Sequence, residues 1–369
     1  MVTETQRLEL RAAIAIGLSA SLTRLICLTL GMEDIPAAFG VVVAVLVIRP
    51  DFYRWPSLLY PVLLLLAGLS MTVGLSVRWM FPAAPEVWWF GVVGVLMQLF
   101  AVALPANLAL LNNAVAAAGV LPLLGPSATW SGLGQQLVAI ALGLAIGTAL
   151  QWGLTPAGYG KAAPTGGPEG QDPPLAERYR LALSSGFFWR KLVLAALALA
   201  IGKGLGTATP KYLYFGVVLL LNDSIGATLA RVKDRMMGVT LGILMPLLVF
   251  NTIGINSVGL ALAMGGSAAL VSVLNQGPYL RTALISTGVA FAGYGPLIAW
   301  YIPNRWIAYL LGSTVALLSG LLLFPNSALS RYRELLDQKG PESNELLQKL
   351  YPEAREEAAW LGQRLPSRD

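Results

Sequence analysis

The chain has 369 residues, of which 56% are hydrophobic and 12% charged, and its mean hydropathy is +0.66. A soluble domain of this length cannot bury so much apolar surface, so the composition predicts a polytopic membrane protein with the lipid bilayer as its main partner. The formal charge of +6 comes without a basic stripe interleaved with aromatic residues, and we expect no nucleic-acid partner. With no histidine and a single cysteine, Cys27, the usual metal, nucleophile and general-base sets are missing. We therefore expect no metal, no cofactor and no enzyme.

Apolar runs between loop signals predict the membrane spans. No Asp, Glu, Lys or Arg occurs between Val87 and Gly160 or between Met236 and Leu280, so each of these runs holds several spans. Pro105 and residues 251–257 supply breaks within them. The spans predicted for the first half are 12–31, 36–48, 57–80, 87–104, 106–124 and 132–154. Those predicted for the second half are 190–207, 212–230, 236–252, 254–274, 278–298 and 304–324.

The two halves repeat a series of markers in the same order. Phe39-Gly40-Val41-Val42 returns as Phe215-Gly216-Val217-Val218, and Gly125-Pro126 with Trp130 returns as Gly295-Pro296 with Trp300. A collinear series at nearly constant separation indicates an internal repeat, as is common in transporters. The predicted fold class is an all-α polytopic membrane protein with about 12 transmembrane helices, arranged as two parallel-oriented six-helix repeats. The predicted domains are a first repeat at 1–156, a cytoplasmic linker at 157–189, a second repeat at 190–325 and a cytoplasmic amphipathic tail at 326–369.

The distribution of Lys and Arg predicts the orientation. These residues gather in the segments that lie inside when the N-terminus is cytoplasmic, and the opposite loops hold only Arg78, Lys211 and Arg305. We therefore expect a multi-pass inner-membrane protein with both termini in the cytoplasm. Within the linker, residues 175–184 predict a short interfacial helix. The tail predicts small helices, split at Gly340-Pro341 and at Pro352, that pack on the cytoplasmic face; partner binding is the alternative role.

Two cations within predicted spans are the first candidates for a binding site. Arg24 follows Arg11 by 13 residues, and Lys203 follows Arg190 by 13 residues, so the halves place a cation at matching depth. A charge within the bilayer costs about 2.5–3.5 kcal/mol on insertion scales, which makes Arg24 and Lys203 candidates for attracting an anion to a shared interior. The alternative is that both side chains extend to the headgroups.

Two short spans at matching positions are the second candidate. Residues 36–48 precede Arg49-Pro50-Asp51, and residues 212–221 precede Asn222-Asp223-Ser224. Ten to thirteen residues cover only about half of a ~30 Å hydrocarbon core at about 1.5 Å per residue, and broken helices expose polar groups to a transport cavity. Asn222 and Asp223 are therefore candidate substrate-binding residues, with Asp223 also the candidate for a coupling proton. The alternative is a plain helix end at the interface.

A third candidate is the charged stretch that leads into the span at 236–252. Asp234 and Arg235 are expected to pair at the span entrance, and Gly238 and Gly242 form a small-xxx-small face for close helix packing. We predict a packing and orienting role for these four residues. Further polar residues that line the interior in this interpretation are Asn112, Asn113, Arg281, Gln135, Gln136, Asn275 and Gln276. The alternative is that the Asn and Gln side chains bridge helices structurally.

Motifs in the second half resemble a known family. Residues 214–218, 224–228 and 234–242 are similar to the short span, the Gly-Ala-Thr turn and the Arg-x-x-Gly-Thr-x-x-Gly helix entry of the fusaric acid resistance and aromatic acid exporter superfamily, the FUSC-like transporters. The sequence departs from this pattern at Val239, where the family usually has Thr, and its linker is shorter than the cytoplasmic domain of the larger exporters. The resemblance implies proton-driven efflux of aromatic carboxylates.

The function expected from these patterns is export of small organic, aromatic carboxylate anions. Plant organic-anion channels are similar to this superfamily, so a passive anion channel is an alternative. A non-transporting membrane assembly component is a second alternative. A homo-oligomer and a periplasmic adaptor are further partners that the sequence leaves open.

Overall fold

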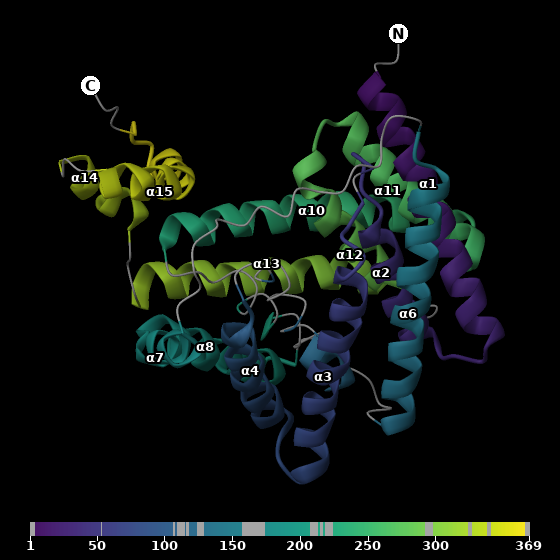
Figure 1. Cartoon of the computed structure of the whole chain (residues 1–369), viewed down its shortest axis with the longest axis horizontal. Helices are drawn as coiled ribbons and strands as arrows, with labels where there is room; N and C mark the ends of the chain where they lie inside the picture. The colour runs from purple at the N-terminus through teal and green to yellow at the C-terminus, as the bar shows by residue number, and fades with distance from the viewer. Residues whose placement is uncertain are drawn as a thin grey trace. The chain divides into compact units, whose positions relative to one another are not determined.

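The computed structural model describes residues 4–52, 54–105, 108, 115, 118–123, 129–156, 174–206, 213–214, 217, 224–291, 298–323, 327–337 and 341–365. All regular elements among them are helices, which confirms the predicted all-α class (Figure 1). The helices of the first half are α1 Glu4–Thr29, α2 Asp34–Val47, α3 Leu59–Met80, α4 Glu86–Ala103, η2 Leu121–Leu123 and α6 Trp130–Gly153. Those that follow are α7 Leu175–Ser184, α8 Gly186–Gly204, α10 Ile225–Thr252, α11 Ser257–Val273, η3 Gly277–Tyr279, α12 Leu280–Phe291, α13 Ile298–Leu323, α14 Ala328–Asp337 and α15 Pro341–Trp360.

Five of the described helices are long and apolar enough to cross a membrane. They are α1, α3, α4, α6 and α10, and α7 with α8 makes a sixth if this pair, bent by 61°, is one span. The chain is therefore a multi-pass membrane protein. Most of the predicted span at 106–124 and of the short span at 212–221 lies outside the described residues. The arrangement of twelve spans in two repeats stays a prediction.

Helix α1 shows how the sequence fits the bilayer. Its buried face carries small side chains, among them Ala13, Ala20 and Cys27, whereas Leu18 and Leu25 are exposed on the opposite side. In water the leucines would form the core, but lipid tails are as apolar as leucine, and small residues let helix backbones approach. This inside-out distribution supports α1 as a lipid-facing span.

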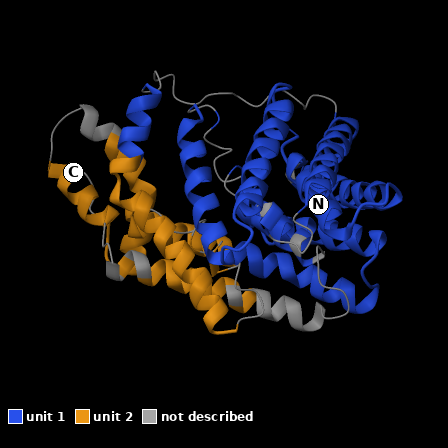
Figure 2. Cartoon of the chain, turned by 90° about the horizontal axis from the view of Figure 1, so that it is seen from below, with its two compact units in different colours: residues 1–182, 237–304 blue, residues 183–236, 305–369 orange. Residues whose placement is uncertain are grey.

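The chain divides into two compact units, coloured separately in Figure 2. Unit 1 consists of residues 1–182 and 237–304, and unit 2 of residues 183–236 and 305–369. Unit 1 thus combines segments from both halves of the sequence.

In unit 1, helices α1 and α11 pack together in antiparallel fashion. A Cβ atom on Gly17 of α1 would lie 2.7 Å from the carbonyl oxygen of Ala261, and one on Gly265 would lie 3.0 Å from that of Ala13. Glycine is needed here because any side chain would push the two backbones apart.

Helix α2 is an enclosed element of unit 1, because it packs against α1, α6 and α12. Its contact with α6 depends on glycine: a Cβ atom on Gly143 would lie 2.1 Å from the carbonyl oxygen of Gly40, and one on Gly147 would lie 2.4 Å from that of Ala44. Cys27 lies wholly buried beside Ala37 of α2 and Ala139 of α6.

A buried hydroxyl ties α12 to its neighbours. Thr287 of α12 lies 2.9 Å from the hydroxyl of Ser267 on α11, and its Oγ1 lies 2.8 Å from the carbonyl oxygen of Gly242 on α10 and 3.0 Å from that of Ala283. One hydroxyl therefore connects three helices within unit 1.

In unit 2 the C-terminal helices pack on the start of α10. The hydroxyl of Ser224 donates to Glu353 of α15 at 2.6 Å, and a Cβ atom on Gly226 would lie 2.1 Å from the carbonyl oxygen of Glu353. Lys233 pairs with Glu356 at 3.3 Å. The tail thus has defined contacts with the first three turns of α10.

The structure corrects two predicted breaks. The charged stretch at residues 231–235 is not a loop between spans, because α10 runs unbroken from Ile225 to Thr252. No Gly or Pro interrupts residues 227–237, and the tail contacts satisfy part of the charge there. Pro352 does not split the tail, since it lies inside α15, where Leu347 and Ala354 on either side of it pack in one cluster with Tyr332 of α14. The predicted helix at residues 175–184 is confirmed as α7.

Candidate functional site

The candidate site is the turn that follows α2. This helix has 14 residues and a length of about 21 Å, shorter than a hydrocarbon core of about 30 Å. One or both of its ends therefore lie within the depth of the membrane if α2 runs along the bilayer normal. Polar groups at such an end are natural candidates for contact with a solute.

The sequence explains why α2 ends here and how the turn is held. Pro50 disfavours helical geometry at Arg49, and Ile48 is already extended. The amide of Phe52 donates to the carbonyl oxygen of Arg49 at 3.0 Å, which closes the turn. Phe52 adopts a positive φ of 53° with its side chain wholly buried, so the core anchors a backbone conformation that a bulky residue rarely takes.

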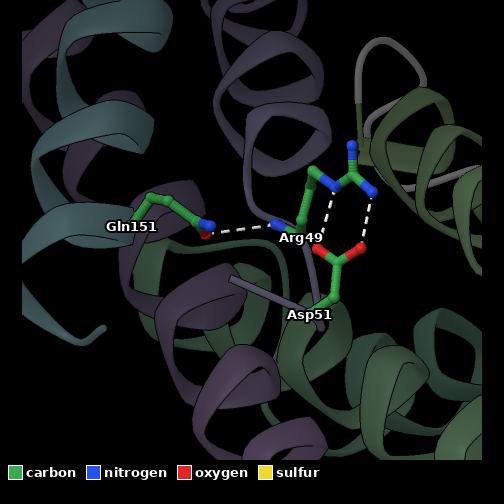
Figure 3. Close-up of polar contacts among 3 residues, drawn as sticks. All are labelled: Arg49, Asp51 and Gln151. Carbon is green, nitrogen blue, oxygen red and sulfur yellow. Dashed lines mark hydrogen bonds and ion pairs between the residues drawn. The ribbon is translucent and has the colours of Figure 1, made fainter. Parts of the chain in front are cut away.

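The guanidinium of Arg49 forms a bidentate ion pair with the carboxylate of Asp51, in which Nε and Nη2 form the two prongs of a planar fork (Figure 3). Its Nε donates to Oδ1 of Asp51 at 2.9 Å, and its Nη2 donates to Oδ2 at 2.5 Å. The backbone N–H of Arg49 donates to Oε1 of the buried Gln151 on α6 at 3.1 Å. The pair itself is accessible, with 28% of the Arg49 side chain and 42% of the Asp51 side chain exposed.

Aromatic side chains follow this pair in the sequence and also occur at the end of α6. The guanidinium of Arg54 lies 5.4 Å from the ring centroid of Trp152, the residue after Gln151 on α6. The rings of Trp55 and Tyr60 stack with their centroids 6.0 Å apart. Residues 49–60 and the end of α6 therefore combine a carboxylate-binding guanidinium with surfaces on which an aromatic ring can stack.

The predicted cation Arg24 has partners in unit 1. Its Nη2 lies 3.2 Å from Oδ1 of Asp34, and its Nη1 donates to the hydroxyl of Ser257 at 3.5 Å. Asp34 was expected in a loop, but it is the first residue of α2. Arg24 and Asp51 thus mark two acid–base pairs at opposite ends of α2.

Other predicted residues are less enclosed or lie in other parts of the chain. Lys203, in unit 2, is exposed in the last turn of α8. Arg281 is exposed at the start of α12. Four predicted residues fall outside the described part of the chain, namely Asn112, Asn113, Asn222 and Asp223.

The residues predicted to pack and orient α10 are all described. Arg235 donates to the hydroxyl of Tyr309 at 3.2 Å and lies over its ring, at 5.2 Å from the centroid. In unit 1, a Cβ atom on Gly238 would lie 2.4 Å from Cβ of Thr282, and one on Gly242 would lie 2.3 Å from the carbonyl oxygen of Ala283. Asp234 lies in the same turn as Lys233 and Arg235 of α10.

Sequence reasoning pointed to residues 49–51 but did not select them as a site. The Arg-Pro-Asp sequence after a short span was the available signal. No sequence pattern indicated a role for Gln151, because its hydrogen bond to the Arg49 amide joins residues 102 positions apart and depends on the packing of α2 against α6.

A comparison with protein families identifies the second half of the chain. Residues 196–319 match the family described as fusaric acid resistance protein-like. No curated protein and no solved structure matches the chain. The family match includes all the motifs at residues 214–242 and confirms the resemblance predicted from them. The chain is therefore a multi-pass membrane protein that is similar, over residues 196–319, to the fusaric acid resistance protein-like family.

Proposed function

We propose that the protein exports small organic anions, and aromatic carboxylates in particular. The observation that carries this proposal is the family match at residues 196–319. The family is named for resistance to fusaric acid, which is an aromatic ring that bears a carboxylate, and efflux is a direct route to such resistance. The Arg49 fork supports the same class of substrate, because a planar guanidinium suits a carboxylate.

Physical chemistry explains why such a substrate needs cations along its path. A carboxylate that enters the bilayer loses its hydration, and a protein lowers this cost with fixed positive groups and hydrogen-bond donors. In unit 1, Arg24 and Arg49 provide guanidinium groups near opposite ends of the enclosed helix α2. In this proposal they bind the anion on its way through the protein.

The finer parts of the proposal concern the transport cycle. Two six-helix repeats would alternate access around the site, with Lys203 and Arg281 as further attracting charges. Asp223, with Asn222 beside it, would take up the coupling proton, and Asn112 and Asn113 would line the path. The protein would lie in the inner membrane with both termini in the cytoplasm, so that export runs away from the cytoplasm.

Counterflow in liposomes tests this function. Liposomes that contain the purified full-length protein are loaded with unlabelled 4-hydroxybenzoate, and the entry of labelled 4-hydroxybenzoate is followed against liposomes without protein. Faster entry with trapped substrate supports an exporter that works by alternating access. Entry that is independent of trapped substrate but driven by the membrane potential would show a passive anion channel instead. The absence of any protein-dependent entry would contradict both the exporter and the channel.

A further inference from the structure

The bidentate pair of Arg49 and Asp51 has the geometry of a carboxylate-binding site that is already filled. Nε and Nη2 of Arg49 face both oxygens of Asp51, and Nη1 points away from the carboxylate (Figure 3). We propose that Asp51 occupies the carboxylate position of a substrate-binding Arg49, and that the carboxylate of the transported anion displaces it. This inference rests on the proposed export of organic anions, and it names the group within the chain that competes with the substrate.

The backbone around Arg49 is held more firmly than the side chain of Asp51. Gln151 accepts the Arg49 amide hydrogen, and the buried Phe52 fixes the other end of the turn. By contrast, the Asp51 side chain is 42% exposed. Rotation of this one side chain would therefore withdraw its carboxylate from Nε and Nη2 of Arg49.

Two other acid–base pairs in the described part of unit 1 lack this arrangement. Arg24 reaches Asp34 with one nitrogen, at 3.2 Å. Arg180 and Glu177 on α7 are 3.7 Å apart, and both are largely exposed. A carboxylate that binds at Arg49 forms two parallel charge-assisted hydrogen bonds with it. The pairs Arg24–Asp34 and Arg180–Glu177 each show a single contact between guanidinium and carboxylate.

The surroundings of Arg49 indicate the class of ligand. Trp152 follows Gln151 at the end of α6 and is half exposed, with Arg54 over its ring. The indole of Trp152 at the end of α6, together with the guanidinium groups of Arg49 and Arg54 after α2, would suit a monocarboxylate with an aromatic ring. A small aliphatic acid would bind to the guanidinium fork of Arg49 but would not stack on the ring of Trp152.

The test compares Asp51→Asn with the wild-type protein in the counterflow assay. Asparagine keeps the size of the side chain but removes the competing charge, so the half-saturating concentration of 4-hydroxybenzoate should fall by about two- to fivefold, the range expected for a partly exposed ion pair. Arg49→Lys keeps the charge but loses the fork, and should raise the half-saturating concentration. Glu177→Gln removes an acid from an exposed pair elsewhere in unit 1 and should change nothing.

The neutral analogue 4-hydroxybenzamide separates carboxylate recognition from a general structural effect. Its inhibition of counterflow should be the same in the wild type, Asp51→Asn and Arg49→Lys. A half-saturating concentration that stays unchanged or rises in folded Asp51→Asn, while wild-type counterflow is normal, overturns the inference and leaves the proposed function intact. If Asp51→Asn does not fold, Arg49→Lys is the deciding variant. A half-saturating concentration of 4-hydroxybenzoate equal to that of the wild type in Arg49→Lys then overturns the inference. No counterflow in the wild type would instead overturn the proposed function.

Discussion

Nη2 of Arg24 lies 3.2 Å from Oδ1 of Asp34, and this ion pair joins α1 to the first turn of α2. The same guanidinium donates to the hydroxyl of Ser257 at the start of α11, so one cation connects the ends of three helices. The acid at the N-terminus of α2 also faces the positive end of that helix, where a negative charge is stabilised.

This relationship predicts non-additive effects of substitution. Arg24→Gln and Asp34→Asn should each lower the unfolding temperature in detergent, with a coupling of about 0.2–1 kcal/mol, because the Asp34 side chain is 65% exposed and the pair is screened. The double variant should therefore lose less stability than the sum of the single variants. Fully additive losses would show that the two side chains do not interact in the folded protein.

The close contact of α2 with α6 predicts a sharp difference between two glycines of the same helix. Gly143→Ala places a methyl group 2.1 Å from a backbone oxygen of α2, whereas Gly134 has open space around its Cβ direction. Gly143→Ala should destabilise the protein by roughly 1–3 kcal/mol or more, since a backbone must shift. Gly134→Ala should be neutral or slightly stabilising, because alanine favours a helix. Thermal unfolding in detergent measures both, and equal midpoints would contradict the close contact.

The buried hydroxyl of Thr287 predicts that removing it lowers the stability of the protein, even when the shape of the side chain is kept. Thr287→Val keeps the side-chain volume but removes the donor to a backbone carbonyl and the partner of Ser267. The expected cost is about 1–3 kcal/mol, because polar groups are left unsatisfied inside the bundle. Thr314→Val is a suitable control, since its hydroxyl bonds to a carbonyl of its own helix on an exposed face. A control as damaging as Thr287→Val would show that the hydroxyl network between helices adds nothing.

The buried contact of Glu357 with the start of α14 predicts that substituting this residue loosens the tail helices of unit 2. Glu357 is almost completely buried, and it accepts hydrogen bonds from the hydroxyl of Ser327 and from the backbone N–H groups of Ala328 and Leu329 at the start of α14. Glu357→Ala should release the tail helices, because it removes this cap. Limited trypsin digestion should then cut after Arg331 and Arg333 sooner than in the wild type.

A matched control for the tail is Glu356→Ala. Its pair with Lys233 is partly exposed, and the expected effect on digestion is small. If the two variants are digested at the same rate, the buried cap does not hold the tail.

Local sequence signals predicted most of the described helices. The lengths of the apolar runs located α3, α4 and α6, and Pro105 and residues 251–257 marked helix ends. The continuity of α10 through Lys233 was not predictable from local charge, because it depends on contacts with α15, more than 100 residues away in the sequence. Likewise, the partner of Arg24 could not be predicted, since the sequence gives no sign that Asp34 begins a helix that packs against α1.

The burial of Cys27 makes the natural chain a ready background for chemical labelling. It is the only cysteine, and its wholly buried thiol is shielded from aqueous reagents by small residues of α2 and α6. A cysteine placed at the exposed Thr252, at the end of α10, or at Ser330, in the tail, would therefore be the site that a membrane-impermeant maleimide reaches first. The side of the membrane on which each segment lies can thus be determined without first removing a native thiol.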